Sequence, residues 1–218
     1  MLACVRRLVA LALAAVAGCG GGSEAPRNGP VELVERLREG GYVLFLRHAL
    51  TDHEEEDAPN VDPRDCAHQR NLTDAGRAQA REIGRAIDEL EIPVGRVETS
   101  EFCRTRDTAR LAFGRSEVSE ILTHLPPKAL RAAHERRLRE LRALFARRPP
   151  DGTNTVLVGH ITSLEDATGV DVEEGDIVVF EPSGEDYDVV AILPSAVWRQ
   201  LLGRVDSTAA RASRSNGF

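Results

Sequence analysis

The stretch from Tyr42 to His48, with the sequence YVLFLRH, decides the fold class. Its first five residues form a continuous apolar run, which is the pattern of a short strand buried inside a sheet. The run ends at the charged pair Arg47-His48, so two reactive side chains follow the predicted strand directly. A second apolar run, from Thr155 to Gly159, ends in the same way at His160. The sequence therefore predicts two buried strands, each followed directly by polar side chains that can take part in a reaction.

Helical patterns alternate with strands along the rest of the chain. Helices are predicted over 30–39, 74–90, 101–113, 127–147 and 194–202, with a short helix after the second apolar run, and further strands over 97–100, 118–122, 177–180 and 189–193. This alternation predicts an α/β fold, a three-layer α/β/α sandwich with a mostly parallel central sheet. The polar stretch 49–70 is predicted to be a long loop, and its acidic run Glu54–Asp57 to be a solvated surface.

The first twenty residues have the pattern of an export signal. Arg6 and Arg7 precede a ten-residue apolar run, Leu8 to Ala17, which is too short to span a bilayer. The run leads into Val16-Ala17-Gly18-Cys19, which resembles the lipobox of bacterial lipoproteins. We therefore expect lipid on Cys19 to anchor the protein to the bacterial cell envelope, on the periplasmic side or the outer face.

This signal divides the chain into four parts. Residues 1–18 are expected to be a signal peptide, 19–29 a lipidated cysteine with a flexible tether, 30–202 one folded domain, and 203–218 a disordered tail. The chain of 218 residues has a net charge of −7. Because nucleic-acid-binding proteins need a basic surface, the acidic balance argues against nucleic acid as a partner.

Two of the four cysteines are accounted for by the signal. Cys4 lies within it, and Cys19 follows its predicted cleavage point. Cys66 and Cys103 remain, and export places them in an oxidising compartment. Two outcomes stay open for this pair, a single disulfide or two free thiols, because the spacing along the chain does not reveal the distance between the Cα atoms.

Three predicted strands lead into side chains that suit phosphoryl transfer. The first ends at Arg47-His48, the second runs into the segment that contains Arg104, and the third ends at His160. Ligands of open α/β sheets bind at the carboxyl ends of the strands, so these residues meet if the strands are neighbours. Guanidinium groups bind phosphate oxygens in pairs, and a neutral imidazole attacks phosphorus. The arginine charges disfavour zinc, so no metal is expected.

Four segments resemble the signatures of the histidine phosphatase superfamily, in its order. They are Arg47-His48-Ala49, residues 71–80 (NLTDAGRAQA), the segment from Ser100 through Arg104 to Ala109, and Val158-Gly159-His160. The resemblance implies a phosphoglycerate-mutase-like fold and a phosphatase that needs no metal or other cofactor. It also implies that His48 becomes phosphorylated, that Arg47 and Arg104 bind phosphate with Thr51 beside them, and that His160 completes the pocket.

The expected substrate is a small phosphomonoester or a phosphohistidine, and two departures from the family pattern bear on its turnover. Ile161 stands where a small residue usually follows the second histidine, and its branched side chain is expected to narrow the pocket or turn His160. No general acid is evident; the candidates are His124, Glu120 and Asp52, with Asp166 after the second histidine. The alternative function is a non-catalytic envelope lipoprotein that binds a phosphorylated ligand.

Overall fold

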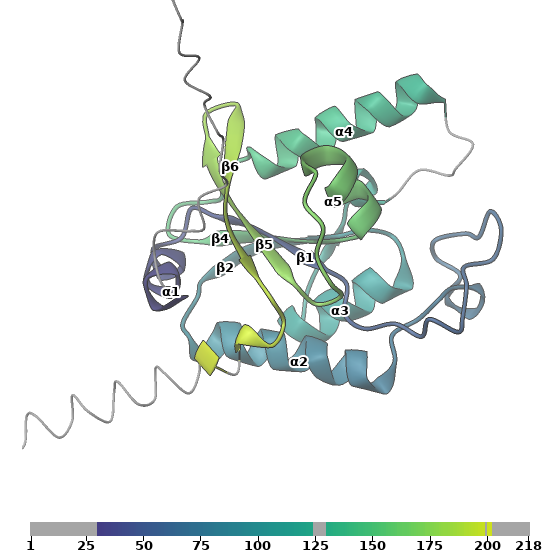
Figure 1. Cartoon of the computed structure of the whole chain (residues 1–218), viewed down its shortest axis with the longest axis horizontal. Coiled ribbons are helices and arrows are strands. Elements are labelled where there is room, and N and C mark those ends of the chain that lie inside the picture. Colours follow the sequence, from purple (N-terminus) through teal and green to yellow (C-terminus); the bar gives the residue numbers. More distant parts are fainter. Residues whose placement is uncertain (1–29, 124–129, 199, 202–218) are drawn as a thin grey trace, which may run out of the picture.

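A computed structural model describes residues 30–123, 130–198 and 200–201, and a six-stranded sheet forms its centre (Figure 1). The strands are β1 (Val43–Arg47), β2 (Val94–Thr99), β3 (Glu117–Val118), β4 (Asn154–Gly159), β5 (Ile177–Ser183) and β6 (Asp186–Leu193). Their order across the sheet is β3-β2-β4-β1-β5-β6. The first four strands run parallel, whereas β5 pairs antiparallel with both β1 and β6. The two apolar runs, β1 and β4, therefore lie side by side at the centre.

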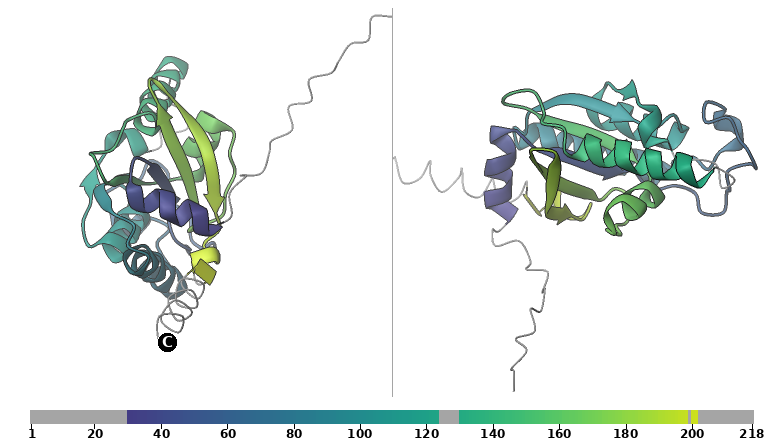
Figure 2. Two further views of the ribbon diagram at one scale, coloured as in Figure 1. Left: turned by 90° about the vertical axis from the view of Figure 1, so that its left-hand side faces the viewer. Right: turned by 90° about the horizontal axis from the view of Figure 1, so that it is seen from above.

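Helices cover both faces of this sheet (Figure 2). They are α1 (Pro30–Glu39), α2 (Asp74–Glu89), α3 (Cys103–Phe113), α4 (Arg131–Phe145) and α5 (Ile161–Thr168), with single 3₁₀ turns at Cys66–His68 and Glu120–Leu122. Side chains of β1 alternate between the faces, as strand geometry requires. Leu44 and Leu46 pack with apolar residues of α1, α2 and α3, while Val43 and Phe45 pack with those of α4 and α5. The predicted three-layer sandwich is confirmed.

Aromatic rings fill the core beneath α4. Phe145 stacks on Phe180 with 4.3 Å between the ring centroids, and Phe45 of β1 meets Phe145 edge-on at 5.8 Å. On the opposite face, Trp198 is fully buried among residues of α1, α2 and the sheet. Because dense packing on both sides leaves little freedom, the central strands hold their carboxyl ends in a fixed position.

Most predicted elements differ from the observed ones by a few residues at one end or both, and three differences matter here. The strand predicted over 118–122 is wrong: β3 ends at Val118, and one 3₁₀ turn follows at Glu120–Leu122. This turn lets Ile121 and Leu122 pack against the core under α4, which a continued edge strand would not do. The helix predicted from residue 127 is described from Arg131, and the last helix begins at residue 197 rather than 194.

Several predicted segments lie outside the described residues. These are the signal peptide 1–18, the tether 19–29, the tail 203–218 and the candidate acid His124. Of the helices that the structure does describe, none has the length and apolar character to cross a membrane.

The loop between β1 and α2 extends from the end of the sheet at which β1 stops (Figures 1 and 2). Its two ends are joined by a β-bridge between Thr51 and Leu72. The start of α2 packs directly on the loop, because a Cβ at Gly76 would collide with the carbonyl group of Leu50. Thr73 caps α2 by accepting a hydrogen bond from the Gly76 N–H at 2.9 Å. The loop is therefore anchored at its base to the sheet and to α2.

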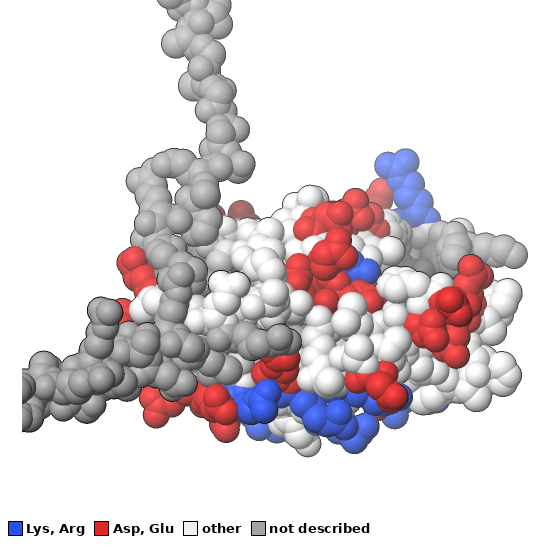
Figure 3. All heavy atoms as spheres, turned by 60° about the horizontal axis from the view of Figure 1, so that its bottom comes forward, with Lys and Arg blue, Asp and Glu red and all other residues white. Residues whose placement is uncertain are grey.

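Charges of both signs cover the face shown in Figure 3. Acidic side chains form separate clusters on it, and arginines form a band along its lower edge. Charged side chains also pair between helices, since Arg77 of α2 lies 3.1 Å from Asp107 of α3.

Candidate functional site

The two histidines come together because β1 and β4 are parallel neighbours. Arg47 lies opposite Gly159 in the sheet, and the His48 N–H donates to the Gly159 carbonyl at 3.1 Å. His48 and His160 therefore leave the sheet at the same level, and their ring centroids are 5.6 Å apart. Both are buried, at 2% and 4% exposure, so their rings share a site with little water.

The surroundings of His48 fix which ring nitrogen is free to react. Its Nδ1 lies 3.0 Å from the carbonyl oxygen of Ala49, which only accepts hydrogen bonds, so Nδ1 carries the proton. The lone pair is then on Nε2. Burial, together with the charges of Arg104 and Arg47, lowers the pKa of His48 to about 3, although the Ala49 carbonyl and Glu174 act in the opposite direction. His48 is therefore a neutral nucleophile above that pH.

His160 is held by the segment that follows β2. Its Nε2 lies 2.8 Å from the Ser100 hydroxyl oxygen, which also accepts a hydrogen bond from the Phe102 N–H at 3.2 Å. The Phe102 ring meets the His160 ring edge-on, with centroids 5.2 Å apart. Since Nε2 is engaged with Ser100, His160 is placed to orient and donate rather than to attack.

Arg104 lies in the first turn of α3, and Asp57 of the long loop binds it with both carboxylate oxygens. The Arg104 Nη1 and Nη2 donate to Asp57 at 3.0 and 3.1 Å. Its guanidinium also lies over the Phe102 ring, 4.5 Å from the centroid. The prediction that the acidic run Glu54–Asp57 is wholly solvated is therefore wrong at Asp57, because topology brings this carboxylate onto a buried cation.

Both arginines keep an unpaired N–H near the histidines. Arg47 donates through Nη1 to the Val172 carbonyl at 2.5 Å, and Arg104 donates to Asp57. Within the part of the chain that the structure describes, the Nε atoms of Arg47 and Arg104 are buried and have no hydrogen-bond partner. A buried donor without a partner is costly, and an anionic ligand that accepted from these N–H groups would remove that cost.

Glu174 is the site residue that the sequence analysis missed. It precedes β5 in a loop that wraps around the signature, since the Gly175 N–H donates to the His48 carbonyl at 3.0 Å. The Gln79 amide donates to the Glu174 carbonyl at 3.0 Å, and a Cβ at Gly175, which has a φ of +88°, would collide with that amide. Only the folded topology brings Glu174 here; its local sequence gives no signal of it.

Thr51 and Arg70 lie beside Glu174. Thr51, a predicted phosphate ligand, donates its hydroxyl to Glu174 at 2.6 Å and its N–H at 3.0 Å, so both donors are engaged by the protein. The Arg70 Nη2 lies 3.7 Å from the Glu174 carboxylate. Arg70 is thus a third guanidinium group near the pocket, one that the sequence analysis did not select.

Three of the four candidate acids make their contacts with groups other than the two histidines. Glu120 is exposed in its 3₁₀ turn, and its carbonyl accepts from Arg137. Asp166 is exposed on α5 and pairs with His134 at 3.3 Å. Asp52 is half-buried, and its carboxylate accepts from the Glu54 N–H at 3.0 Å within the same turn. None of these three carboxylates has a recorded contact with His48 or His160 in the described residues.

The Ile161 side chain is half-buried. It packs against the apolar cluster formed by α4, α5 and the sheet, and it occupies the first position of α5. His160 at the same time keeps its hydrogen bond to Ser100. The contact with Ser100 is thus made with Ile161 in place, and the predicted narrowing of the pocket or turning of His160 stays a prediction.

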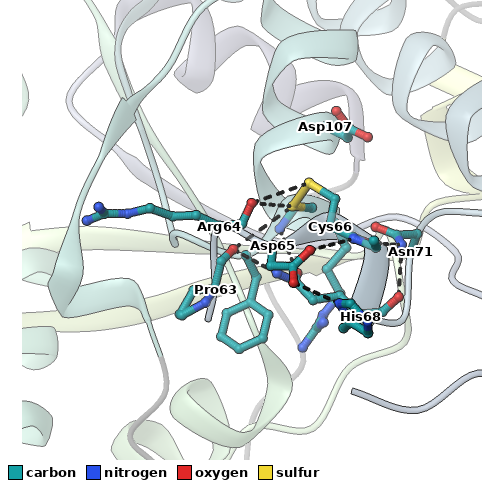
Figure 4. Close-up of a disulfide and its surroundings, with 12 residues drawn as sticks. Pro63, Arg64, Asp65, Cys66, His68, Asn71 and Asp107 are labelled. Carbon is teal, nitrogen blue, oxygen red and sulfur yellow. Dashed lines mark hydrogen bonds and ion pairs between the residues drawn. A yellow bond between two sulfur atoms is a disulfide. The ribbon is translucent and has the colours of Figure 1, made fainter. Parts of the chain in front are cut away.

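A disulfide joins the long loop to the start of α3 (Figure 4). Cys66 and Cys103 are bonded, with 5.6 Å between their Cα atoms. Next to it, the Gln69 side chain accepts from the Cys103 N–H at 3.0 Å and donates to the Pro63 carbonyl at 2.8 Å. Because Cys103 precedes Arg104, these bonds fix the segment that carries Asp57 against the residue that Asp57 binds.

Within the described ranges, no group of three or more His, Cys, Asp or Glu side chains is arranged to hold a metal ion. The two histidines lie near arginines that also contact carboxylates.

Part of the sequence and the fold resemble those of known phosphatases. A model of the histidine phosphatase superfamily (branch 1) matches residues 43–141. This span includes the first histidine, Arg104 and the long loop, and it ends before β4 and His160. No curated protein sequence matches the chain.

Solved structures share the fold at low identity. The alpha-ribazole phosphatase of Shigella flexneri is 16% identical over 70% of this chain and 95% of its own, with a TM-score of 0.52. A candidate alpha-ribazole-5'-P phosphatase of Escherichia coli is 14% identical over 72% and 98%, with a TM-score of 0.54. An Entamoeba histolytica phosphoserine phosphatase variant, solved with phosphoserine, is 12% identical over 71% and 97%, with a TM-score of 0.51. These likenesses concern the fold.

Proposed function

We propose that this protein is a histidine phosphatase, which hydrolyses a small phosphomonoester or a phosphohistidine through a phosphorylated His48. The site geometry, the family model that matches residues 43–141 and the shared fold support this. The observation that carries the proposal is the neutral His48, with its lone pair on Nε2, beside two buried guanidinium N–H groups that have no partner in the described residues.

The first chemical step transfers the phosphoryl group to His48. The Nε2 lone pair forms a bond to phosphorus, the bond from phosphorus to the leaving oxygen breaks, and that oxygen takes the electron pair. Arg47 and Arg104 hold the phosphoryl oxygens, on which negative charge collects in the transition state. His160, held by Ser100, completes the donor set. The leaving alkoxide takes its proton from the solvent.

The second step regenerates the enzyme. A water oxygen bonds to phosphorus, the nitrogen–phosphorus bond breaks, and its electron pair returns to Nε2. The two protons of the water leave with the phosphate, and His48 becomes neutral again. Each step uses groups of this chain, water and substrate, and no metal is part of the proposal.

The position of the candidate acids bears on the substrate class. In the described residues the carboxylates of Glu120, Asp52 and Asp166 have no contact with either histidine, and the fourth candidate, His124, lies outside these residues. General acid catalysis usually contributes about 10²–10⁴-fold. Substrates with good leaving groups, such as aryl phosphates and phosphoramidates, are therefore expected to be turned over faster than simple alkyl phosphates.

The proposed activity is tested by phosphate release from p-nitrophenyl phosphate, across pH 4–8, with EDTA present throughout. We expect multiple turnovers that EDTA does not inhibit, because the nucleophile and the phosphate ligands are side chains. The alternative function, a protein that binds a phosphorylated ligand without hydrolysing it, predicts inorganic phosphate binding without turnover. That result, measured by isothermal titration and a colorimetric phosphate assay, would contradict the proposal.

We further propose that the protein is exported and anchored by lipid on Cys19. The signal pattern of residues 1–19 supports this, as does the Cys66–Cys103 disulfide, because such bonds persist in oxidising compartments. Protein isolated from membranes of an expressing bacterium is expected to lack residues 1–18, to carry lipid, and to have no free thiol at either of the two bonded positions. Mass spectrometry checks this; retention of residues 1–18 with both thiols free would contradict it.

A further inference from the structure

The buried carboxylate of Glu174 takes no part in the two steps described above. The residue is 4% exposed, and each carboxylate oxygen accepts a hydrogen bond from Thr51, at 2.6 and 3.0 Å. Burial raises the pKa of Glu174, but the hydrogen bonds from Thr51 and the nearby His48 and His53 outweigh it and hold the pKa below its ordinary value. The carboxylate is therefore ionised, and it has no proton to give to a leaving group.

Cationic and ionisable groups surround this carboxylate on several sides. They are His53 Nε2 at 3.4 Å, Arg70 Nη2 at 3.7 Å, His48 Nδ1 at 3.8 Å and Arg47 Nη2 at 3.9 Å. The groups come from β1 and from the loop that follows it, whereas Glu174 comes from the loop before β5. The fold thus places the negative charge of Glu174 near the guanidinium groups of Arg47 and Arg70 and near the Nδ1 atom of His48.

Phosphoryl transfer changes the charge of His48. Its ring is neutral before the attack and keeps the Nδ1 proton afterwards, so it becomes an imidazolium as the nitrogen–phosphorus bond forms. The charges of Arg104 and Arg47 disfavour a positive charge on this ring, while Glu174 favours it. In a buried site such interactions are much stronger than in water. Glu174 lies on the Nδ1 side, opposite the nitrogen that attacks.

We propose that Glu174 is a positioning residue of the reaction, whose carboxylate stabilises the positive charge that develops on the His48 ring during phosphoryl transfer. This role rests on the proposed function. The same carboxylate repels the dianionic phosphate group that the arginines bind. Glu174 therefore weakens binding of the ground state and favours the transition state, which is the combination that raises a catalytic rate.

The variant Glu174→Gln separates these two effects. We expect formation of phosphohistidine, measured by single turnover with an alkaline quench, to slow about 10²-fold, because the transition state loses a buried charge partner. Inorganic phosphate is expected to bind about 3–10-fold more tightly by isothermal titration, because the repulsion is gone. If Glu174 has only a structural role, the variant is expected to bind phosphate more weakly, because displacement of the loop around Thr51 would reduce both phosphate affinity and the rate of phosphorylation.

Two further variants complete the experiment. Glu173→Gln removes the charge of the exposed neighbouring glutamate and is expected to change neither measurement. Glu174→Asp keeps the charge but withdraws it by about one bond length, and it is expected to phosphorylate faster than Glu174→Gln. Should Glu174→Gln fail to fold, Glu174→Asp carries the test, with slower phosphorylation than the unaltered protein and phosphate binding that is not weakened.

The outcomes distinguish the two proposals. If Glu174→Gln weakens phosphate binding and phosphorylation together, or changes neither, the role of Glu174 is wrong while the proposed function stands. If the unaltered protein forms no phosphohistidine, the proposed function is wrong, and the role of Glu174 in that reaction falls with it.

Discussion

Substitution of His48 by alanine is expected to reduce phosphate release by about 10³-fold or more, because the reaction loses its nucleophile. The geometry distinguishes His48 from His160 for this role. The Nδ1 of His48 faces the Ala49 carbonyl at 3.0 Å and leaves Nε2 with its lone pair, whereas the Nε2 of His160 is engaged with Ser100 at 2.8 Å. Steady-state turnover of p-nitrophenyl phosphate and detection of phosphohistidine measure the loss.

Acidification is not expected to reproduce this loss by protonating His48, because burial lowers its pKa to about 3. His134→Ala is the matched control: this histidine is exposed on α4 and pairs with Asp166. The control is expected to retain full activity, and the His48 variant to retain phosphate binding through its arginines. Undiminished turnover in the His48 variant, together with a loss in His160→Ala, would assign the nucleophile to the other ring.

The central part of this site is readable in the sequence for a physical reason. The apolar run that stops at Arg47-His48 predicts both a buried strand and the position of its carboxyl end. The second run predicts the same for the strand that ends before His160. Once β1 and β4 pair, parallel geometry brings the two ends together, so local pattern and topology agree here.

The roles of Glu174 and Asp57 could not be predicted from local sequence patterns, because the residues that they contact are far away in the chain. Glu174 lies more than a hundred residues from Thr51, and Asp57 lies in a polar run whose composition resembles solvated loops. Their roles depend on which cation each carboxylate meets after folding. A charge pattern alone does not contain that information, since the same acidic residues on an open surface would face water.

The error over 118–122 has a similar origin. Short apolar runs are ambiguous between a strand and a turn of helix, and the deciding factor is what the side chains pack against. Ile121 and Leu122 both pack against the core beneath α4. Successive residues of a strand would point to opposite faces of the sheet, whereas a 3₁₀ turn lets both face the same side. Tertiary packing therefore overrode the local pattern at this point.

The second large effect is expected from Arg104→Lys, which should lower kcat/KM for p-nitrophenyl phosphate about 10²-fold, nearly as much as Arg104→Ala. Arg104 donates hydrogen bonds to Asp57 through Nη1 and Nη2. Its Nε is buried and has no hydrogen-bond partner in the described residues. A planar guanidinium serves a carboxylate on one edge and an anion on another at the same time. A lysine ammonium is a compact point charge, so it can bind the Asp57 carboxylate or the phosphate but not both. Each charge-assisted hydrogen bond that is lost costs about 1.5–3 kcal/mol.

Arg106→Lys provides the control on the same helix, because Arg106 is exposed and lies two residues further along. It is expected to leave kcat/KM unchanged and so to show that α3 tolerates the exchange. A melting curve of Arg104→Lys separates loss of the site from loss of the fold. If Arg104→Lys is folded and fully active, Asp57 rather than phosphate is the main ligand of Arg104, and the phosphate must then be held by Arg47 and the third guanidinium, Arg70, whose Nη2 lies 3.7 Å from Glu174.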